Sequence, residues 1–532
     1  MARARIKIWQ PIALGALLLT GLAAPGPARA SATQFSILQD DGVLLGSTPH
    51  DPNKAMAEAK ALGVDVVRVG IGWSKVSPKP LSRSMPAGFD VGNPNSPGYD
   101  WRYYDNFVER ARLNGLKVLM TLAPPLPFWA SEEPSRCPHR IGGYRNLALS
   151  CMWKPKPKLF GEFAKAVVRR YGSSAPNAAA GGHGGQLALY SLWNEPNLEH
   201  YLYPQLVRTR HGTVDVAARR YRELWSEGWK AIAANDPAMR NKVLFGETAA
   251  ISSPMDTLYA ALCLDERGRP FRGKLKSLQG CTRPERLPIG GLALHPYNKE
   301  GGGSVFSRSF TQDSLPLAHV NRAHRLMDRA ARLGRIPGGR GIYITEFGFQ
   351  SSPPDRVIRT SLPRHAAALN EAERLFYGDR RIKSTAQYEI FDVPDHREFN
   401  TGLRLVSGRK KPAWDAYRMP LVVTKLSGDL VEVWGHVRPA QGRVRLSVTT
   451  VGSSRTTVAR PRTNSAGYFR IRLRRRDATR LRYRLEWRNP DGAVLRSRIA
   501  RAGPRIRYFP DSPTGSSAAF TAWASLKSSF ML

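Results

Sequence analysis

Between residues 35 and 420, eight short apolar runs alternate with longer amphipathic segments. The apolar runs have the length and β-branched composition of buried strands, and the segments between them have the apolar spacing of helices. Strands that alternate with helices form a parallel sheet, and eight such units close into a barrel with helices outside. We therefore expect an α/β fold of the (β/α)8, or TIM barrel, type. The expected strands are residues 35–39, 64–73, 116–123, 187–193, 243–247, 290–297, 341–345 and 384–392.

Two of these strands lead into a glutamate that is followed within two positions by a turn residue, proline or glycine. Glu195 lies in Trp-Asn-Glu-Pro-Asn at 193–197, and Glu346 lies in Thr-Glu-Phe-Gly at 345–348. Burying an unpaired carboxylate is costly, so a carboxylate at the end of a buried strand indicates a site. Retaining glycoside hydrolysis needs two carboxyl groups about 5–5.5 Å apart, one as acid/base and one as nucleophile. The alternative for either segment alone is a strand followed by a turn with a solvated glutamate.

The segments around Glu195 and Glu346 resemble the acid/base and nucleophile strands of the clan of (β/α)8 retaining glycoside hydrolases that includes cellulases and β-xylosidases. Within this clan the chain is most similar to glycoside hydrolase family 39, from about residue 35 to about 420. The resemblance implies a hydrolase of O-glycosyl bonds that works by double displacement, with Glu195 as acid/base and Glu346 as nucleophile. It implies a polysaccharide or oligosaccharide substrate and no cofactor.

The resemblance also assigns supporting roles on other strands. In the clan, the asparagine before the acid/base binds the sugar 2-hydroxyl, which corresponds to Asn194 here. An arginine in the second strand supports the nucleophile, which corresponds to Arg68. The sixth-strand pattern His-x-Tyr matches His295 and Tyr297, and the tyrosine hydroxyl is expected to touch the nucleophile. The alternative for His295 is a histidine whose hydrogen bonds are satisfied inside the fold. The glycines at 301–303 follow on the same face as a candidate lid.

The aromatic floor of the sugar site departs from the clan pattern. Many members carry a tryptophan at the end of the eighth strand, where this chain offers Tyr388 and Phe391. Trp73, Trp129 and Tyr203 are candidates to stack on sugar faces, and packing inside the fold is the equal alternative for each.

The N-terminus indicates export. Residues 1–30 combine a basic start, an apolar run at 12–24 and small residues at 28–30, which is the pattern of a secretory signal peptide. A membrane anchor is the alternative, but the apolar run is short for a bilayer span. We expect a secreted protein that is either free or associated with the cell surface.

The cysteines fit the same compartment. Cys137, Cys151, Cys263 and Cys281 allow three pairings, and we favour 137–151 with 263–281 because each closes one local loop. There is no Cys-x-x-Cys or His-x-x-x-His, so we expect no metal site.

A second domain follows the barrel at 421–510. Its apolar residues recur at every second position, as in Phe469, Ile471 and Leu473, and arginines fill the positions between them. This period predicts an antiparallel, immunoglobulin-like β-sandwich with one dry face and one basic face. We expect residues 31–420 to form the catalytic domain and the Ser/Ala-rich residues 511–532 to be a disordered tail.

The net charge of +39 predicts attraction to polyanions such as anionic cell-wall polymers, with the C-terminal domain as the binding part. A basic solvated surface without a partner is the plain alternative. No nucleic-acid motif accompanies the charge, so we expect no nucleic-acid partner, and we expect a monomer. The rival functions are a non-catalytic carbohydrate-binding protein and a cell-surface adhesion protein on the same scaffold. We expect a barrel cut near Leu421 to keep most of its hydrolysis.

Overall fold

The computed structural model describes residues 34–138, 150–173, 185–298, 304–305, 311, 313–356, 360–394 and 399–509. The expected signal peptide at 1–30, the glycine run at 301–303 and the tail at 511–532 lie outside the described residues.

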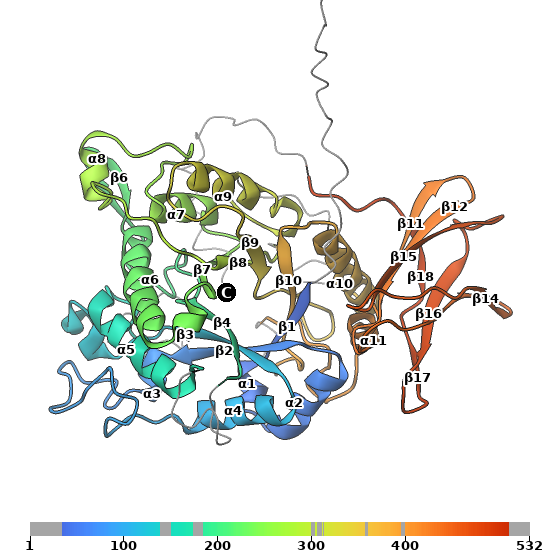
Figure 1. Cartoon of the computed structure of the whole chain (residues 1–532), viewed down its shortest axis with the longest axis horizontal. Coiled ribbons are helices and arrows are strands. Elements are labelled where there is room, and N and C mark those ends of the chain that lie inside the picture. The colour runs from blue at the N-terminus through green and yellow to red at the C-terminus, as the bar shows by residue number, and fades with distance from the viewer. Residues whose placement is uncertain are drawn as a thin grey trace, which may run out of the picture.

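Eight parallel strands close into a barrel in the order β1-β10-β9-β8-β7-β4-β3-β2, which confirms the expected TIM barrel (Figure 1). Their side chains are almost all buried, as expected of strands covered by helices outside and by side chains within the barrel. The strands are β1 (Phe35–Gln39), β2 (Val66–Gly72), β3 (Lys117–Ala123), β4 (Leu187–Leu192), β7 (Val243–Ala249), β8 (Gly291–His295), β9 (Gly341–Ile344) and β10 (Ile382–Tyr388).

Helices follow each strand and cover the outside of the barrel (Figure 1). Helix α2 begins where Asp51 accepts hydrogen bonds from the N–H groups of Asn53 and Lys54, which satisfies two donors that the first turn leaves free. The helices are α1 (Asp41–Leu44), α2 (Pro52–Ala61), α3 (Trp73–Val76), α4 (Arg102–Leu113), α5 (Pro157–Tyr171), α6 (Val216–Asn235), α7 (Pro254–Ala261), α8 (Gly273–Leu278), α9 (Arg322–Arg332), α10 (Leu362–Tyr377) and α11 (Pro412–Arg418). None of the helices in the described ranges is long and apolar enough to cross a membrane.

A short hairpin between β4 and α6 was not expected from the sequence. Its strands, β5 (Leu206–Thr209) and β6 (Gly212–Asp215), pair antiparallel and are largely exposed. A hairpin this short and exposed has no apolar alternation to reveal it.

Both favoured disulfides are present. Cys137 pairs with Cys151 and Cys263 pairs with Cys281, and each closes a loop between barrel elements. Paired cysteines are typical of proteins from oxidising compartments, so the structure fits an exported protein.

The C-terminal domain is a β-rich sheet domain, as expected. Its strands pair in the order β14-β13-β16-β18-β11-β12-β15, with β17 on β16. Pairing is antiparallel except for β11 with β18, which run parallel. Apolar residues from both halves of this path form one buried cluster, and the intervening arginines of β15 are exposed. The strands are β11 (Leu421–Ser427), β12 (Leu430–His436), β13 (Ser447–Val451), β14 (Arg455–Ala459), β15 (Tyr468–Arg474), β16 (Arg482–Arg488), β17 (Val494–Arg496) and β18 (Ala500–Gly503).

This domain packs against α10 and α11 of the barrel (Figure 1). Glu373 on α10 receives a hydrogen bond from Arg438 and lies 3.0 Å from His436 Nδ1, and all three side chains are buried. Asn370, one turn earlier, accepts hydrogen bonds from the Leu421 N–H at 3.1 Å and from Arg498 at 2.8 Å. Buried polar contacts therefore join the two domains.

Candidate active site

The two glutamates lie together at the carboxyl end of the barrel strands. An oxygen of Glu195, an oxygen of Glu346 and a ring nitrogen of His295 all lie within 4.8 Å of one another. The structure gathers most of the residues expected from the sequence around this point, namely Arg68, Asn194, Glu195, His295, Tyr297 and Glu346.

Glu195 is held in a tight turn after β4. Trp193 and Glu195 have φ angles of 72° and 42°, in the left-handed region that side chains other than glycine rarely adopt. The Glu195 N–H donates to the Glu247 carbonyl at 2.9 Å, and Asn197 Oδ1 accepts the Ala249 N–H at 3.0 Å. These bonds fasten the turn to the end of β7. Strain of this kind persists where surrounding contacts hold it, and it gathers at functional sites.

Glu346 follows β9 and faces three donor groups. Arg68 donates to its Oε1, the Tyr297 hydroxyl donates to its Oε2 at 3.3 Å, and His295 Nδ1 lies 3.6 Å from Oε2. Burial, together with the charge of Glu346, raises the pKa of Tyr297 well above its usual value, so the phenol keeps its proton and remains a donor. These contacts fix the orientation of the Glu346 carboxyl group.

Arg68 connects four side chains at the centre of the barrel. Its Nη1 donates to Glu346 and to Gln39, and its Nη2 donates to Glu247 and, at 2.9 Å, to Asn194 Oδ1. Burial alone would lower its pKa, but Glu247 and Glu346 raise it, so the guanidinium stays charged. Two carboxylates therefore compensate one buried guanidinium, as a buried charge requires.

Sequence reasoning missed two residues of this network, Gln39 and Glu247. Glu247 is the charged one. It lies in a register shift between β7 and β8, where Gly246 and Thr248 both pair while Glu247 does not, and its φ is 50°. Such a bulge re-aims a side chain, and here it sends the Glu247 carboxylate to Arg68 and to His295 Nε2, 3.0 Å away. Its form, a carboxylate near the end of a buried strand, is the same signal that marked Glu195 and Glu346.

His295 bridges Glu195 and Glu247. Its Nδ1 lies 2.8 Å from Glu195 and its Nε2 lies 3.0 Å from Glu247. Burial would lower its pKa, but Glu346, Glu195 and Glu247 raise it to about 10, so near neutral pH the ring is an imidazolium that donates from both nitrogens. Burial raises the pKa of Glu195, and the His295 hydrogen bond opposes that rise. A raised pKa suits a carboxyl group that must donate a proton.

The spacing of Glu195, His295 and Glu346 also matches that of metal ligands, and it is the group with this property among the described residues. A metal ligand must be a neutral imidazole, whereas the pKa of His295 is raised to about 10. Arg68 already supplies a cation to Glu346. The charges of the trio therefore fit hydrogen bonding better than metal binding.

Trp73 and Trp129 are not at the site, which corrects the stacking role considered for them. Trp73 is fully buried and Trp129 is 2% exposed. Trp73 stacks on Phe163 at 5.4 Å and meets Trp129 edge-on at 6.1 Å. The sequence pattern placed aromatic residues near strand ends, but it did not show that helix α5 covers Trp73 or that Trp129 packs on Trp73 and Phe89.

Three aromatic residues lie at the end of β10 or after it. Tyr388 meets Tyr297 edge-on at 6.3 Å, so it lies beside the site as expected. Phe391 stacks on His50 at 3.8 Å instead. Phe399 also meets Tyr297 edge-on, at 4.8 Å, and is 40% exposed. Phe399 is therefore an exposed aromatic surface beside the site, and no sequence pattern points to it.

The chain matches no family model and no curated protein. Among solved structures it is similar to a glucosidase from Croceicoccus marinus, with a TM-score of 0.48, 12% identity, and coverage of 84% of this chain and 94% of that one. It is also similar to the cellulose synthase subunit Z of Clostridioides difficile, with a TM-score of 0.39, 13% identity, and coverage of 72% and 99%. It is also similar to exo-β-1,4-mannosidase Op5Man5 from Opitutaceae bacterium strain TAV5, with a TM-score of 0.39, 13% identity, and coverage of 74% of this chain and 61% of that one. We therefore base the function on the geometry of the site.

Proposed function

We propose that the protein is a secreted glycoside hydrolase, similar to family 39, that cleaves O-glycosidic bonds of a polysaccharide or oligosaccharide with retention of configuration. One observation carries the proposal: carboxyl oxygens of Glu195 and Glu346 lie within 4.8 Å of each other at the ends of barrel strands. Retaining enzymes keep the two carboxyl groups about 5–5.5 Å apart, whereas inverting enzymes keep them about 6.5–9.5 Å apart to admit a water.

In the first step, a carboxylate oxygen of Glu346 attacks the anomeric carbon while Glu195 gives its proton to the leaving glycosidic oxygen. Arg68 and Tyr297 donate hydrogen bonds to the Glu346 carboxylate and orient it. The bond from the anomeric carbon to the leaving oxygen breaks as the ester to Glu346 forms. The released alcohol carries the proton that Glu195 held.

In the second step, Glu195 is ionised and takes a proton from water as that water attacks the anomeric carbon. The ester bond breaks, and Glu346 leaves as a carboxylate. Glu346 is uncharged while it is esterified, and its charge is one of the causes that raise the pKa of Glu195. The pKa of Glu195 therefore falls in the intermediate, which suits its change from acid to base.

Asn194 is oriented to assist both steps. Its Oδ1 accepts a hydrogen bond from Arg68 at 2.9 Å, which leaves the amide N–H groups as donors. A sugar 2-hydroxyl is the acceptor that the clan resemblance implies for them. We propose Phe399 and Tyr388 as the apolar surface for the face of the same sugar, since rings of this kind pack against sugar C–H groups.

The test is turnover of a panel of aryl glycosides by the wild type and by Glu346→Gln and Glu195→Gln. Glu346→Gln removes the nucleophile, so we expect turnover to vanish while circular dichroism stays native. In Glu195→Gln, the rate on substrates with poor leaving groups should fall roughly 100- to 10,000-fold, which is the usual contribution of general acid catalysis. With a nitrophenyl glycoside, the same variant should lose little of the rate of the first step, because the nitrophenolate leaving group needs no proton. Equal losses on both substrates would contradict the acid role, and sugar binding without turnover in the wild type would favour the non-catalytic alternative.

A further inference from the structure

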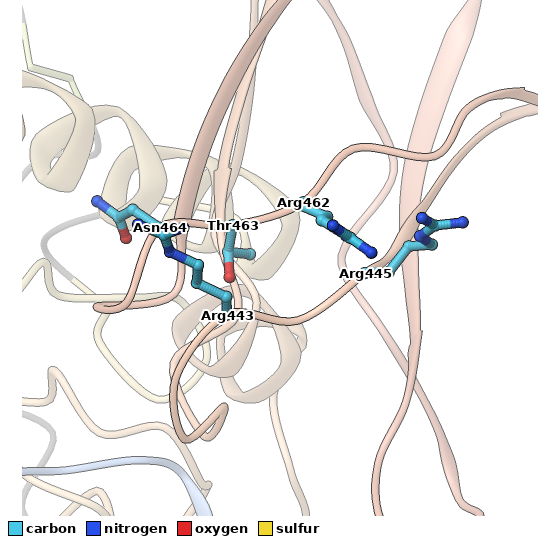
Figure 2. Close-up of a pocket in the computed structure, with 5 residues that line it drawn as sticks. All are labelled: Arg443, Arg445, Arg462, Thr463 and Asn464. Carbon is cyan, nitrogen blue, oxygen red and sulfur yellow. The ribbon is translucent and has the colours of Figure 1, made fainter.

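A hollow in the C-terminal domain, remote in sequence from the catalytic strands, is lined by arginines that form no ion pair with any described residue. Its volume is about 620 Å³. Figure 2 shows the five side chains that line it. The lining comes from two neighbouring segments, one leading into β13 and one following β14. The lining residues are Arg443, Arg445, Arg462, Thr463 and Asn464.

The two segments hold the arginines in fixed register. Arg445 and Arg462 form an antiparallel bridge, and the Thr463 N–H donates to the Val444 carbonyl at 2.9 Å. The Thr463 hydroxyl in turn accepts the Val444 N–H at 3.0 Å. The backbone of the hollow is therefore ordered by hydrogen bonds, and like charges stand directly opposite each other in it. Opposed like charges on paired strands are destabilising, and an anion between them relieves the repulsion.

No acidic side chain within the described residues compensates these arginines. Residues 421–509 contain 20 arginines and one lysine against five acidic residues. Glu432 pairs with Arg374 at 2.8 Å, and Glu486 pairs with Arg455 at 3.0 Å. The other acidic residues contact different groups: Asp477 lies 3.7 Å from Arg480, Asp429 accepts the Asp477 N–H at 3.1 Å, and Asp491 accepts a hydrogen bond from Asn489 at 3.1 Å. The three guanidinium groups of the hollow thus keep their donors for an external anion.

We propose that the hollow formed by Arg443, Arg445 and Arg462 binds carboxylate groups of an acidic polysaccharide. Guanidinium groups form paired hydrogen bonds with carboxylates, and this match makes arginine the usual residue for such recognition. The Asn464 Oδ1 accepts the N–H groups of Ala466 and Tyr468, so its amide N–H groups are directed to donate to sugar hydroxyls. None of the lining residues is aromatic, which disfavours single-stranded nucleic acid, whose bases stack on aromatic side chains.

This inference rests on the proposed function for its ligand class, because a polysaccharide hydrolase gains from a second site on the same polymer. Engaging two sites on one chain makes the second contact intramolecular and raises the apparent affinity. The hollow would then keep the barrel on a polymer between cleavage events.

The experiment measures binding of the full chain to polygalacturonate at fixed ionic strength, using a background of Glu346→Gln to prevent cleavage. In this background we compare Arg443→Gln/Arg445→Gln/Arg462→Gln with a control of equal charge change, Arg472→Gln/Arg474→Gln/Arg501→Gln, at exposed arginines outside the hollow. The hollow variant should lose roughly 10- to 100-fold in affinity, since hydrogen bonds to charged groups are the stronger ones. The control should lose much less, and methyl-esterified polygalacturonate should bind weakly to every variant.

Equal losses in the two triple variants would overturn the site, because they would mean that the general positive field does the binding. Tighter binding of single-stranded DNA than of polygalacturonate would overturn the polysaccharide assignment. The same arginine substitutions in the wild-type background should leave turnover of a neutral aryl glycoside unchanged. Failure of the proposed hydrolysis would appear separately, as absent aryl glycoside turnover in the wild type with polygalacturonate binding intact.

Discussion

Four charged side chains of the site balance one another once Glu195 holds a proton. The carboxylates of Glu247 and Glu346 then face the cations of Arg68 and His295. A balanced buried group avoids the cost of an uncompensated charge, and adding one more negative charge at Glu195 breaks the balance. In the proposed mechanism, this balance is the physical reason for assigning the transferable proton to Glu195 rather than to its neighbours.

Replacing His295 tests this balance through the pH profile. The His295 hydrogen bond and charge lower the pKa of Glu195, which burial raises. His295→Asn removes the cation, so the pKa of Glu195 should rise further and the basic limb of kcat/KM should move to higher pH. The measurement is kcat/KM against pH on a substrate with a poor leaving group. A basic limb that stays in place or moves to lower pH would show that Glu195 does not titrate there.

Replacing Glu247 tests a positioning role. Glu247→Gln keeps the shape of the side chain but weakens its hydrogen bonds with Arg68 and His295. We expect kcat to fall up to about 100-fold with a smaller change in KM, because small misplacements of reacting groups slow the chemical step. Glu247 is also one cause of the pKa of His295 reaching about 10, so that pKa should fall in the variant. Nitrogen-15 NMR of the imidazole measures it. An unchanged imidazole titration would leave Glu247 with a purely structural role.

At the scale of elements, strand ends were predictable and their local irregularities were not. The alternation of apolar runs and helices placed Glu195, Glu346 and Tyr297 correctly, because parallel strands in a barrel bring their carboxyl ends to one face. The bulge that turns Glu247 inward depends on the pairing of β7 with β8, which no local pattern contains. The burial of Trp73 depends likewise on packing by helix α5.

Phe399, in the segment after β10, is the subject of a further prediction. Phe399 is exposed beside Tyr297, and Phe399→Ala should raise KM several-fold, up to about tenfold, with little change in kcat, in keeping with the free energy of one aromatic contact. Michaelis–Menten kinetics on an oligosaccharide measure the effect. Tyr103→Ala, at an exposed aromatic residue on α4, is the control and should behave as wild type. If both variants match the wild type, Phe399 is not a sugar platform.

Helix α10 offers a matched pair for stability. Glu373→Gln leaves Arg438 buried without its carboxylate and should cost about 3–5 kcal/mol of unfolding free energy. Glu371→Gln, on the same helix, breaks the partly exposed pair with Arg364 and should cost about 0–1 kcal/mol. Urea unfolding followed by circular dichroism compares them. Equal costs would show that the buried contact does not hold the domains together.

The carboxyl group of Glu373 also makes the stability of the protein depend on pH. Burial opposes its ionisation, but Arg438 and His436 lower the pKa of Glu373 below its usual value. A lowered folded-state pKa contributes stability above the unfolded pKa, and this stability disappears as pH falls through the folded pKa. Glu373→Gln should therefore lose less stability on acidification than the wild type.

At the scale of the whole molecule, the two domains are less separable than the change of sequence period suggests. The sequence predicted a boundary near Leu421, and the strands do begin there. Contacts across the boundary involve Glu373, Asn370 and Arg374, which lie on α10 and carry no sequence signal of a partner. A barrel cut at Leu421 would remove Arg438 and His436 and expose the surface of α10, including Tyr377, that the C-terminal domain covers. We therefore expect the cut barrel to lose stability, and hydrolysis with it, rather than retain most of its activity.

The central claim is that Glu195 and Glu346 act by double displacement, and the configuration of the first product tests it most directly. Proton NMR during hydrolysis of an accepted glycoside by the wild type records which anomer forms before mutarotation. The account predicts the same anomeric configuration as the substrate, because two successive displacements restore it. An inverted first product would contradict it, since a single displacement by water needs a gap wider than the one that separates these two carboxyl groups.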